Sequence, residues 1–329
     1  MKKLILAVVA IAVSLGAVAQ VKARWGSINV RYPLDFQSEV PDVEVNHVSA
    51  WRGESVNLQL LVYNRQDHPT MPMTDRSVTY RFSDLKCGNS VIPASNVVGG
   101  FVQPVITDCF MGCGRHEVDA YGDVLVADRI TADNPTVVPM GAYRGLWLTV
   151  QVPQNVVPGI YEGCVELTCE GKETIYNYSV NVLDRTLPSP KEWTFHLDLW
   201  QHPSAVARME NLEMWSDEHF EAIKQHMRPL AEAGQKVITT TLNRDPWGYQ
   251  CYDDYEHMII WTLKKDVSWS YDYTVFDRYV ETMMELGIKK QINCYSMIPW
   301  NNSLSWYVEE SNAFISRSCP ATSELFEQV

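Results

Sequence analysis

The stretch Glu192–Pro203, EWTFHLDLWQHP, decides the fold class of the second half of the chain. Its apolar side chains alternate with Thr194, His196 and Asp198, which is the period-two pattern of a β-strand. In a (β/α)8 barrel, one face of each strand packs on helices and the other points into the barrel. We therefore expect the apolar face to contact helices. His196 and Asp198 are then expected in the interior, near the C-terminal end of the strand.

The residues after this stretch alternate between helix and strand patterns. We expect helices over 216–233 and 274–286, each beginning at a residue that can cap it, and strands over 236–242 and 291–298. Both helices end at a glycine that is followed by lysine and an apolar strand, in EAGQKVI and ELGIKKQI. Pro229 is expected to kink or divide the first helix. This βα repetition predicts a parallel sheet or a TIM-like barrel over residues 191–329.

The preceding part of the chain reads as β structure. Short runs with period-two or β-branched patterns are separated by turn signals, and no helical periodicity is evident. We therefore predict an N-terminal antiparallel β-sandwich over residues 20–185, joined to the barrel by the proline-containing linker 186–190. The predicted strands are Ser55–Asn64, Ser77–Phe82, Gly145–Val152, Tyr161–Cys169 and Ile175–Leu183.

The N-terminus has the pattern of a secretory signal peptide. Two lysines precede an apolar run that ends at Val13, and Ala17-Val18-Ala19 forms a cleavage site. The alternative of a membrane anchor is disfavoured because the run is too short to span a bilayer. We expect cleavage after residue 19, a periplasmic or extracellular location, and no membrane span.

Composition narrows the range of partners. The formal net charge of −13 disfavours binding to nucleic acid. The eight cysteines fit an oxidising compartment. Cys109 and Cys113 could bridge locally, whereas Cys164 and Cys169 differ in strand parity and are less suited to pairing. A zinc site at Cys109 and Cys113 would need further ligands that do not stand out, so no metal or cofactor is expected.

Polar side chains followed by tryptophan mark the ends of all three predicted barrel strands. An aromatic face packs on the C–H face of a sugar, and polar groups pair with its hydroxyls. The alternative is that the tryptophans are packing anchors under long loops, and His196 alone fits a satisfied interior histidine. The predicted substrate-binding residues are Asp198, Trp200, Asp245, Trp247, Asn293, Tyr295 and Trp300.

Two aromatic-rich segments follow the second barrel strand. Residues 249–261 and 268–273 are expected to form a β-hairpin lid or a small hydrophobic core, and the core is favoured for most of them. Glycoside hydrolysis normally uses two carboxyl groups, so adjacent acids matter. Asp217-Glu218 starts a predicted helix, Asp253-Asp254 falls in a loop, and Glu309-Glu310 is expected on a helix. Motifs of Ser/His/Asp hydrolases, P-loop proteins and HExxH proteases are not evident.

Six motifs carry a resemblance to a known family. WTFHLDLWQHP, WSDEHF, AGQKVITTTLNRDPWG and WSYDYTVFDRYVETMMELGIKKQINCYSMIPWNN resemble secreted glycoside hydrolase family 123 and its Bacteroides-type relatives with the DUF4091 domain. LVADRI and LWLTVQVPQNVVPGIYEG resemble the N-terminal domain of that family. The resemblance implies a β-sandwich, a TIM-like barrel and action on β-linked N-acetylgalactosamine. It also implies substrate-assisted catalysis, in which the acetamide oxygen of the sugar attacks the anomeric carbon and an Asp-Glu pair assists.

The sequence departs from the family pattern after the third barrel strand. No Asp-Glu pair follows that strand, and far fewer residues follow Pro190 than the roughly 250 of a full barrel. We therefore expect a C-terminally truncated member, inactive alone and poorly soluble, to which no catalytic residue is assigned. The rival hypothesis is a non-catalytic carbohydrate-binding or surface-adhesion protein that uses the sandwich. A structural remnant without activity is the third.

Overall fold

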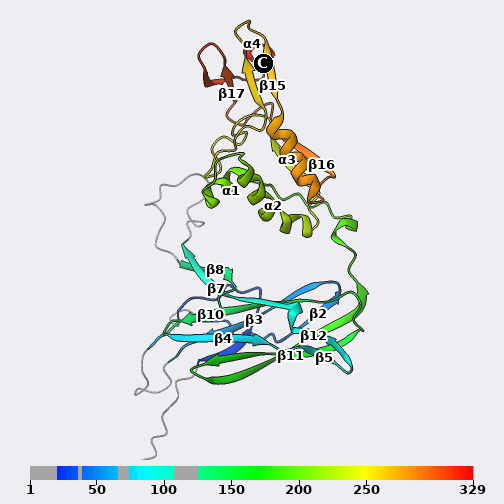
Figure 1. Cartoon of the computed structure of the whole chain (residues 1–329). Coiled ribbons are helices and arrows are strands. Elements are labelled where there is room, and N and C mark those ends of the chain that lie inside the picture. The colour runs from blue at the N-terminus through cyan, green and yellow to red at the C-terminus, as the bar shows by residue number, and fades with distance from the viewer. Residues whose placement is uncertain (1–20, 36–38, 66–73, 107–124, 329) are drawn as a thin grey trace, which may run out of the picture. The chain divides into compact units, whose positions relative to one another are not determined.

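The computed structural model describes residues 21–35, 39–65, 74–106 and 125–328 (Figure 1). Contacts within the chain separate two compact units. The first comprises the described residues up to Leu187, and the second begins at Pro188. The predicted signal peptide, Cys109 and Cys113 lie outside the described residues.

Within its described residues, the first unit consists of two β-sheets and one 3-10 turn, η1 (Ala94–Asn96). The five-stranded sheet contains, in spatial order, β1 (Lys22–Gly26), β3 (Ser55–Tyr63), β10 (Tyr143–Gln151), β7 (Val97–Ile106) and β8 (Leu125–Thr131). The seven-stranded sheet contains β2 (His47–Arg52), β12 (Lys172–Thr186), β11 (Gly159–Cys169), β4 (Arg76–Phe82) and β9 (Thr136–Val138), with β5 (Leu85–Cys87) and β6 (Ser90–Ile92) attached beside β11.

The two sheets share one hydrophobic core. Alternate residues of β3 and β10 are buried in it, and Leu60 lies opposite Leu146 in the antiparallel register. Alternate residues of β11 and β12, such as Val165 and Val180, enter the same core from the other sheet. The prediction of a purely antiparallel sandwich needs one correction, because β2 pairs with β12 in parallel.

The second unit contains helices and two small sheets. A 3-10 turn, η3 (Pro190–Glu192), precedes the rest. The helices are α1 (Pro203–Glu210), α2 (Asp217–Glu232), α3 (Thr274–Glu285) and α4 (Glu324–Gln328). Strands β13 (Val237–Thr241) and β16 (Gln291–Tyr295) form a parallel pair. The other sheet has the order β15 (Trp269–Asp272), β14 (Ile260–Leu263), β17 (Ser303–Val308) and β18 (Ala313–Ser318).

The prediction of an incomplete TIM-like barrel over residues 191–329 is wrong. In the described part of the second unit, the parallel βα arrangement is limited to β13, β16 and the helices that pack on them. The segment between the two strands instead supplies the hairpin β14–β15, which pairs with the hairpin β17–β18 in a mixed sheet. This sheet has its own core around Trp261 and Trp306, so the aromatic residues predicted as a lid or a small core form both a hairpin and a core.

The stretch that predicted the first barrel strand is not a strand. It makes one parallel bridge, between Leu197 and Gln235. Beyond that bridge, glutamine side chains replace the backbone ladder. Gln235 Nε2 donates to the oxygen atoms of Leu199 and Val237 at 3.0 and 2.7 Å, and Gln201 Oε1 accepts a bond from Thr239 N at 2.7 Å. Leu199, expected to contact helices, is exposed.

Local signals within the second unit gave mixed results. Helix α2 begins where predicted, with Ser216 Oγ accepting a bond from His219 N at 3.1 Å, but it runs through Pro229 without dividing. The N-cap residue of helix α3 is Tyr273, not Thr274, and its side chain makes no capping bond. The Asp272 carboxylate instead accepts bonds from the Thr274 backbone and hydroxyl at the start of the helix. The residues before Glu309 form β17 and not the expected helix, since they pair with β18.

Candidate functional site

Three of the predicted binding residues form one aromatic cluster. The ring centroids of Trp200 and Trp247 lie 5.1 Å apart, and those of Trp247 and Tyr295 lie 4.8 Å apart. Trp200 and Tyr295 close the triangle at 5.4 Å. The cluster therefore joins three segments: the one that follows the bridge residue Leu197, the loop after β13 and the end of β16.

Burial divides the cluster into a base and an open surface. Trp247 is only 4 % exposed and also contacts the ring of Tyr255 at 4.4 Å. Trp200 is 53 % exposed. Trp247 therefore supports the cluster from within, and Trp200 offers the ring surface that a ligand can reach.

A polar pair joins two of the same segments. Asn293 Nδ2 donates to Asp198 Oδ2 at 3.1 Å, and Gln291 Nε2 donates to Asn293 Oδ1 at 2.6 Å. The second carboxylate oxygen of Asp198, Oδ1, is buried and has no hydrogen-bond partner among the described residues. A buried carboxylate oxygen favours a donor, so this atom has the capacity to accept a bond from a ligand hydroxyl or amide.

Asp245 and Trp300 lie in two loops that touch one another. The Trp300 backbone N–H donates to Pro246 O at 3.0 Å. The carboxylate of Asp245 accepts a bond from Tyr249 N at 2.7 Å, which stabilises the turn that carries Trp247. The ring of Trp300 is 66 % exposed and makes no ring contact with the cluster among the described residues.

Sequence reasoning did not single out His202 and Tyr255, which lie against the cluster. Their rings stack at 3.6 Å, and His202 Nε2 donates to Asp253 O at 3.1 Å. Burial lowers the pKa of His202 and raises the pKa of Tyr255. A neutral imidazole results, whose Nδ1 is buried without a partner among the described residues. The sequence signal for His202 was its position just after Trp200, at the end of the first predicted barrel strand.

A cavity of about 440 Å³ is lined in part by residues next to Asp245 and Tyr255 in the chain. Arg244 and Glu256, the chain neighbours of Asp245 and Tyr255, line it together with His257 and Phe314. The rings of His257 and Phe314 stack at 5.3 Å. Burial and, as the smaller cause, the nearby Arg244 guanidinium together lower the pKa of His257 to about 4. The cavity thus holds a neutral histidine beside the ion pair of Arg244 and Glu256.

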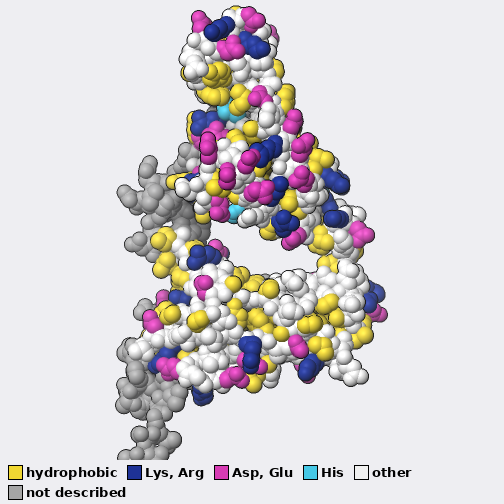
Figure 2. Space-filling view, viewed as in Figure 1, with side chains coloured by type: hydrophobic (Ala, Val, Ile, Leu, Met, Phe, Trp, Pro, Cys, Tyr) yellow, Lys and Arg dark blue, Asp and Glu magenta, His cyan; other side chains and the backbone are white. Residues whose placement is uncertain are grey.

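The described residues carry none of three further features: a metal-ligand cluster, a membrane-spanning helix or a disulfide. No group of three or more His, Cys, Asp or Glu side chains among the described residues has the arrangement of a metal site. No described helix is long and apolar enough to cross a membrane. The six cysteines within the described ranges are free thiols. Acidic and basic side chains are interspersed on the face drawn in Figure 2.

Comparisons with known proteins bear on both units. The model of the glycoside hydrolase 123 catalytic domain matches residues 200–329, and that of the glycoside hydrolase 123 N-terminal domain matches residues 25–169. The chain belongs to glycoside hydrolase family 123. The catalytic-domain match includes all the predicted binding residues except Asp198. No curated protein matches the chain significantly.

Solved structures show the same relationship at the level of fold. The chain is similar to a family 123 glycoside hydrolase from Clostridium perfringens, with 24 % identity and a TM-score of 0.81 over 93 % of this chain and 53 % of that one. The chain thus spans about half the length of that enzyme. A PapD-like domain of human CEP192 matches 55 % of this chain and 98 % of its own, at 9 % identity and a TM-score of 0.24.

Proposed function

We propose that this family 123 chain forms the sugar-contacting part of a hydrolase that acts on β-linked N-acetylhexosaminides, including N-acetylgalactosamine. The observation that carries the proposal is the aromatic cluster beside Asp198 and Asn293. The axial C–H groups of a pyranose pack on an aromatic ring, and its hydroxyl and acetamide groups need hydrogen-bond partners. Trp200 supplies the exposed ring, and the unpartnered Asp198 Oδ1 supplies an acceptor.

The proposed chemistry is substrate-assisted hydrolysis. The oxygen of the 2-acetamido group attacks the anomeric carbon, the glycosidic bond breaks, and a carboxylic acid donates its proton to the leaving oxygen. Water then opens the cyclic intermediate. We assign the described residues to binding and orientation of the sugar. Asp217 and Glu218 do not serve as the acid pair, because they begin α2 and Asp217 pairs with Arg278 at 2.7 Å.

The similar enzyme supports a choice of substrate class. The Clostridium perfringens protein is described by its hydrolysis of glycolipid glycans. Glycolipid head groups that carry a terminal β-linked N-acetylhexosamine are therefore the first substrates to test. Export by the N-terminal signal sequence, which would bring the protein to such extracellular glycans, is part of the proposal.

The test compares Trp200→Ala with Trp51→Ala, a control that removes an exposed tryptophan of the first unit. N-acetylgalactosamine is titrated while saturation-transfer NMR reports binding, and release of nitrophenol from 4-nitrophenyl N-acetyl-β-galactosaminide reports turnover. We expect the Trp200 variant to bind about tenfold more weakly, given the stacking energy and buried area of an aromatic contact. The control should match the wild type. Equal affinity in all three proteins would contradict the proposed site.

A further inference from the structure

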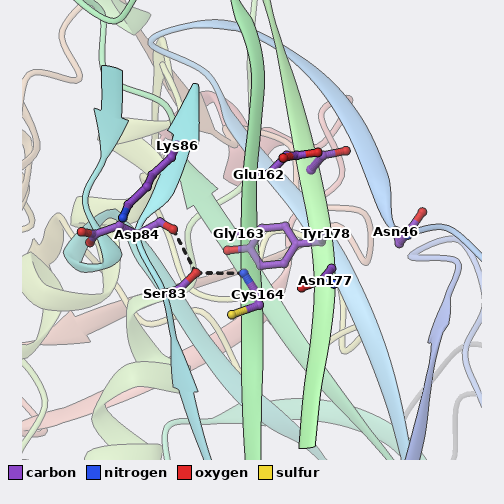
Figure 3. A pocket seen from close by; sticks show the side chains of 10 residues that line it. Asn46, Ser83, Asp84, Lys86, Glu162, Gly163, Cys164, Asn177 and Tyr178 are labelled. Carbon is purple, nitrogen blue, oxygen red and sulfur yellow. Dashed lines mark hydrogen bonds between the residues drawn. The ribbon is translucent and has the colours of Figure 1, made fainter. Parts of the chain in front are cut away.

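A second cavity, of about 570 Å³, lies in the first unit, apart from the aromatic cluster (Figure 3). Its lining comes largely from the outer face of the seven-stranded sheet. Glu162 and Cys164 of β11 and Asn177 and Ser179 of β12 alternate with residues that enter the sandwich core. The volume falls within the roughly 300–1,000 Å³ of small-molecule sites.

The hollow lies where the chain between β4 and β5 leaves the regular ladder along the edge of β11, since both strands pair with β11. Ser83 N donates to Cys164 O at 3.1 Å, and Ser83 Oγ accepts a bond from Cys164 N at 2.9 Å. This close approach depends on Gly163, since a Cβ atom at this position would lie 2.8 Å from Leu85 Cγ. The segment Ser83–Lys86 therefore forms a wall beside β11, where an ordinary sheet face would be flat.

The polar groups around the hollow are of mixed type. Ser83 and Asp84 bond to Cys164 and Ala94 through their side chains. The other polar groups are two amides, a hydroxyl, a carboxylate and an ammonium group, and none of these five side chains bonds to another described residue. They are Asn46, Asn177, Ser179, Glu162 and Lys86. Such a lining is too polar for a lipid and too mixed in charge for a simple anion or cation. It matches a ligand that presents many hydroxyl groups, which both donate and accept hydrogen bonds.

The side chain of Tyr178 does not add to this polar surface. It alternates with Asn177 and Ser179 on β12, so its ring lies in the sandwich core, 5.7 Å from the ring of Trp25. Figure 3 shows that ring across β11 at Gly163. The groups that a ligand can reach are therefore the side chains on the outer face of the sheet and the wall beside β11.

We propose that this cavity binds a saccharide unit, and that the sandwich is a second, non-catalytic carbohydrate site in this protein. The ligand class is a neutral mono- or oligosaccharide, with hydroxyls placed between the polar side chains of Asn46, Asn177 and Ser179 and the acid and amine of β11 and β5. The site is separate from Trp200 and does not require that the proposed hydrolase activity exist. Its role is to hold the protein on a glycan while another part of the chain contacts a sugar.

The thiol of Cys164 gives a local readout for the test, because it is half-buried in the cavity lining. The full chain is alkylated with iodoacetamide at increasing concentrations of N-acetylgalactosamine, N-acetylglucosamine, galactose or their β-linked disaccharides. Peptide mass spectrometry then measures the rate at Cys164. The test variant is Asn177→Ala/Ser179→Ala. The matched control is Asn181→Ala, on the same face of β12 but outside the lining.

We expect at least one of these sugars to protect Cys164. The double variant should raise the half-protecting concentration about tenfold, the change expected for two lost neutral hydrogen bonds. Asn181→Ala and Trp200→Ala should leave protection unchanged, which separates this site from the aromatic cluster. Absence of protection by every sugar, or equal protection in the double variant, would overturn the proposal. Loss of protection in Trp200→Ala would do so as well, because it would place the bound sugar at the other site.

Discussion

Replacement of Gln201 by leucine tests how the rim segment, residues 198–201 with Asp198 and Trp200, is held beside β13. Gln201 is 1 % exposed, and its Oε1 accepts the Thr239 amide at 2.7 Å while Nε2 donates to Val237 O at 3.3 Å and to Leu199 O. Leucine has a similar size but no polar atoms. Gln201→Leu therefore removes the polar connection without a large change in packing volume.

The expected cost follows from what remains bonded. Val237 O keeps its bond from Gln235 Nε2 at 2.7 Å, so it stays satisfied. Thr239 N loses its partner inside a strand whose residues are all buried. An unsatisfied buried amide costs about 1–3 kcal/mol. At about 1.4 kcal/mol per factor of ten, this corresponds to roughly 5- to 150-fold faster hydrogen exchange at Thr239.

Hydrogen exchange of the 237–241 peptide measures this directly, together with the urea midpoint of the second unit. The control is Gln225→Leu, which makes the same chemical change on the exposed face of α2. We expect it to leave exchange in β13 unchanged. If Gln201→Leu also left both the exchange rate and the urea midpoint at wild-type values, the hydrogen bonds of the Gln201 side chain would not hold this segment. A loss of sugar binding at Trp200 without faster exchange would point instead to a direct ligand contact by Gln201.

Three further substitutions have defined outcomes. Trp247→Ala should cost about 3–5 kcal/mol in urea unfolding, because it empties the centre of the aromatic cluster. Gly163→Ala should cost about 1–3 kcal/mol by overpacking against the buried Leu85, and cysteine alkylation should show a changed cavity. His257 should titrate in NMR near pH 4, below its ordinary value of 6.5. Stability should therefore be full above about pH 6.5 and fall by about 3 kcal/mol as the pH drops to 4, a dependence that His257→Gln should remove.

Elements with local signals were predictable from the sequence. The strands β3, β10, β11 and β12 show alternation because one face of each enters the sandwich core. Helices α2 and α3 end at Gly234 and Gly287, both at positive φ, as the repeated Gly-Lys pattern predicts. In each case the residues that specify the element lie within the element or next to it.

The errors came where distant residues decide the structure. The alternation in Glu192–Pro203 predicted a strand. Beyond Leu197, however, its hydrogen bonds run through the side-chain amides of Gln201 and Gln235 and not through a backbone ladder. Likewise, the parallel pairing of β2 with β12 joins residues far apart in sequence and leaves no period of its own. At the site, the aromatic binding residues were predicted from their residue types and their positions at the ends of predicted strands. The stacking of His202 on Tyr255 was missed, because nothing local predicts which loop will fold against the rim.

Buried amides, more than sheet pairing, determine where the rim residues lie. Gln235 and Gln201 hold the segment that carries Asp198 and Trp200. On the other side of β13, Asn243 accepts a bond from Ser305 N at 2.8 Å and donates to Ser305 O at 2.9 Å, which ties the rim loop to β17. Each amide has a donor and an acceptor in one plane, so each fixes both the distance and the orientation of two segments. A change at one of these positions should therefore displace the sugar-contacting rings before it unfolds the helices that pack on β13, because the rings depend on these bonds and the helices on the core around Ile223 and Ile238.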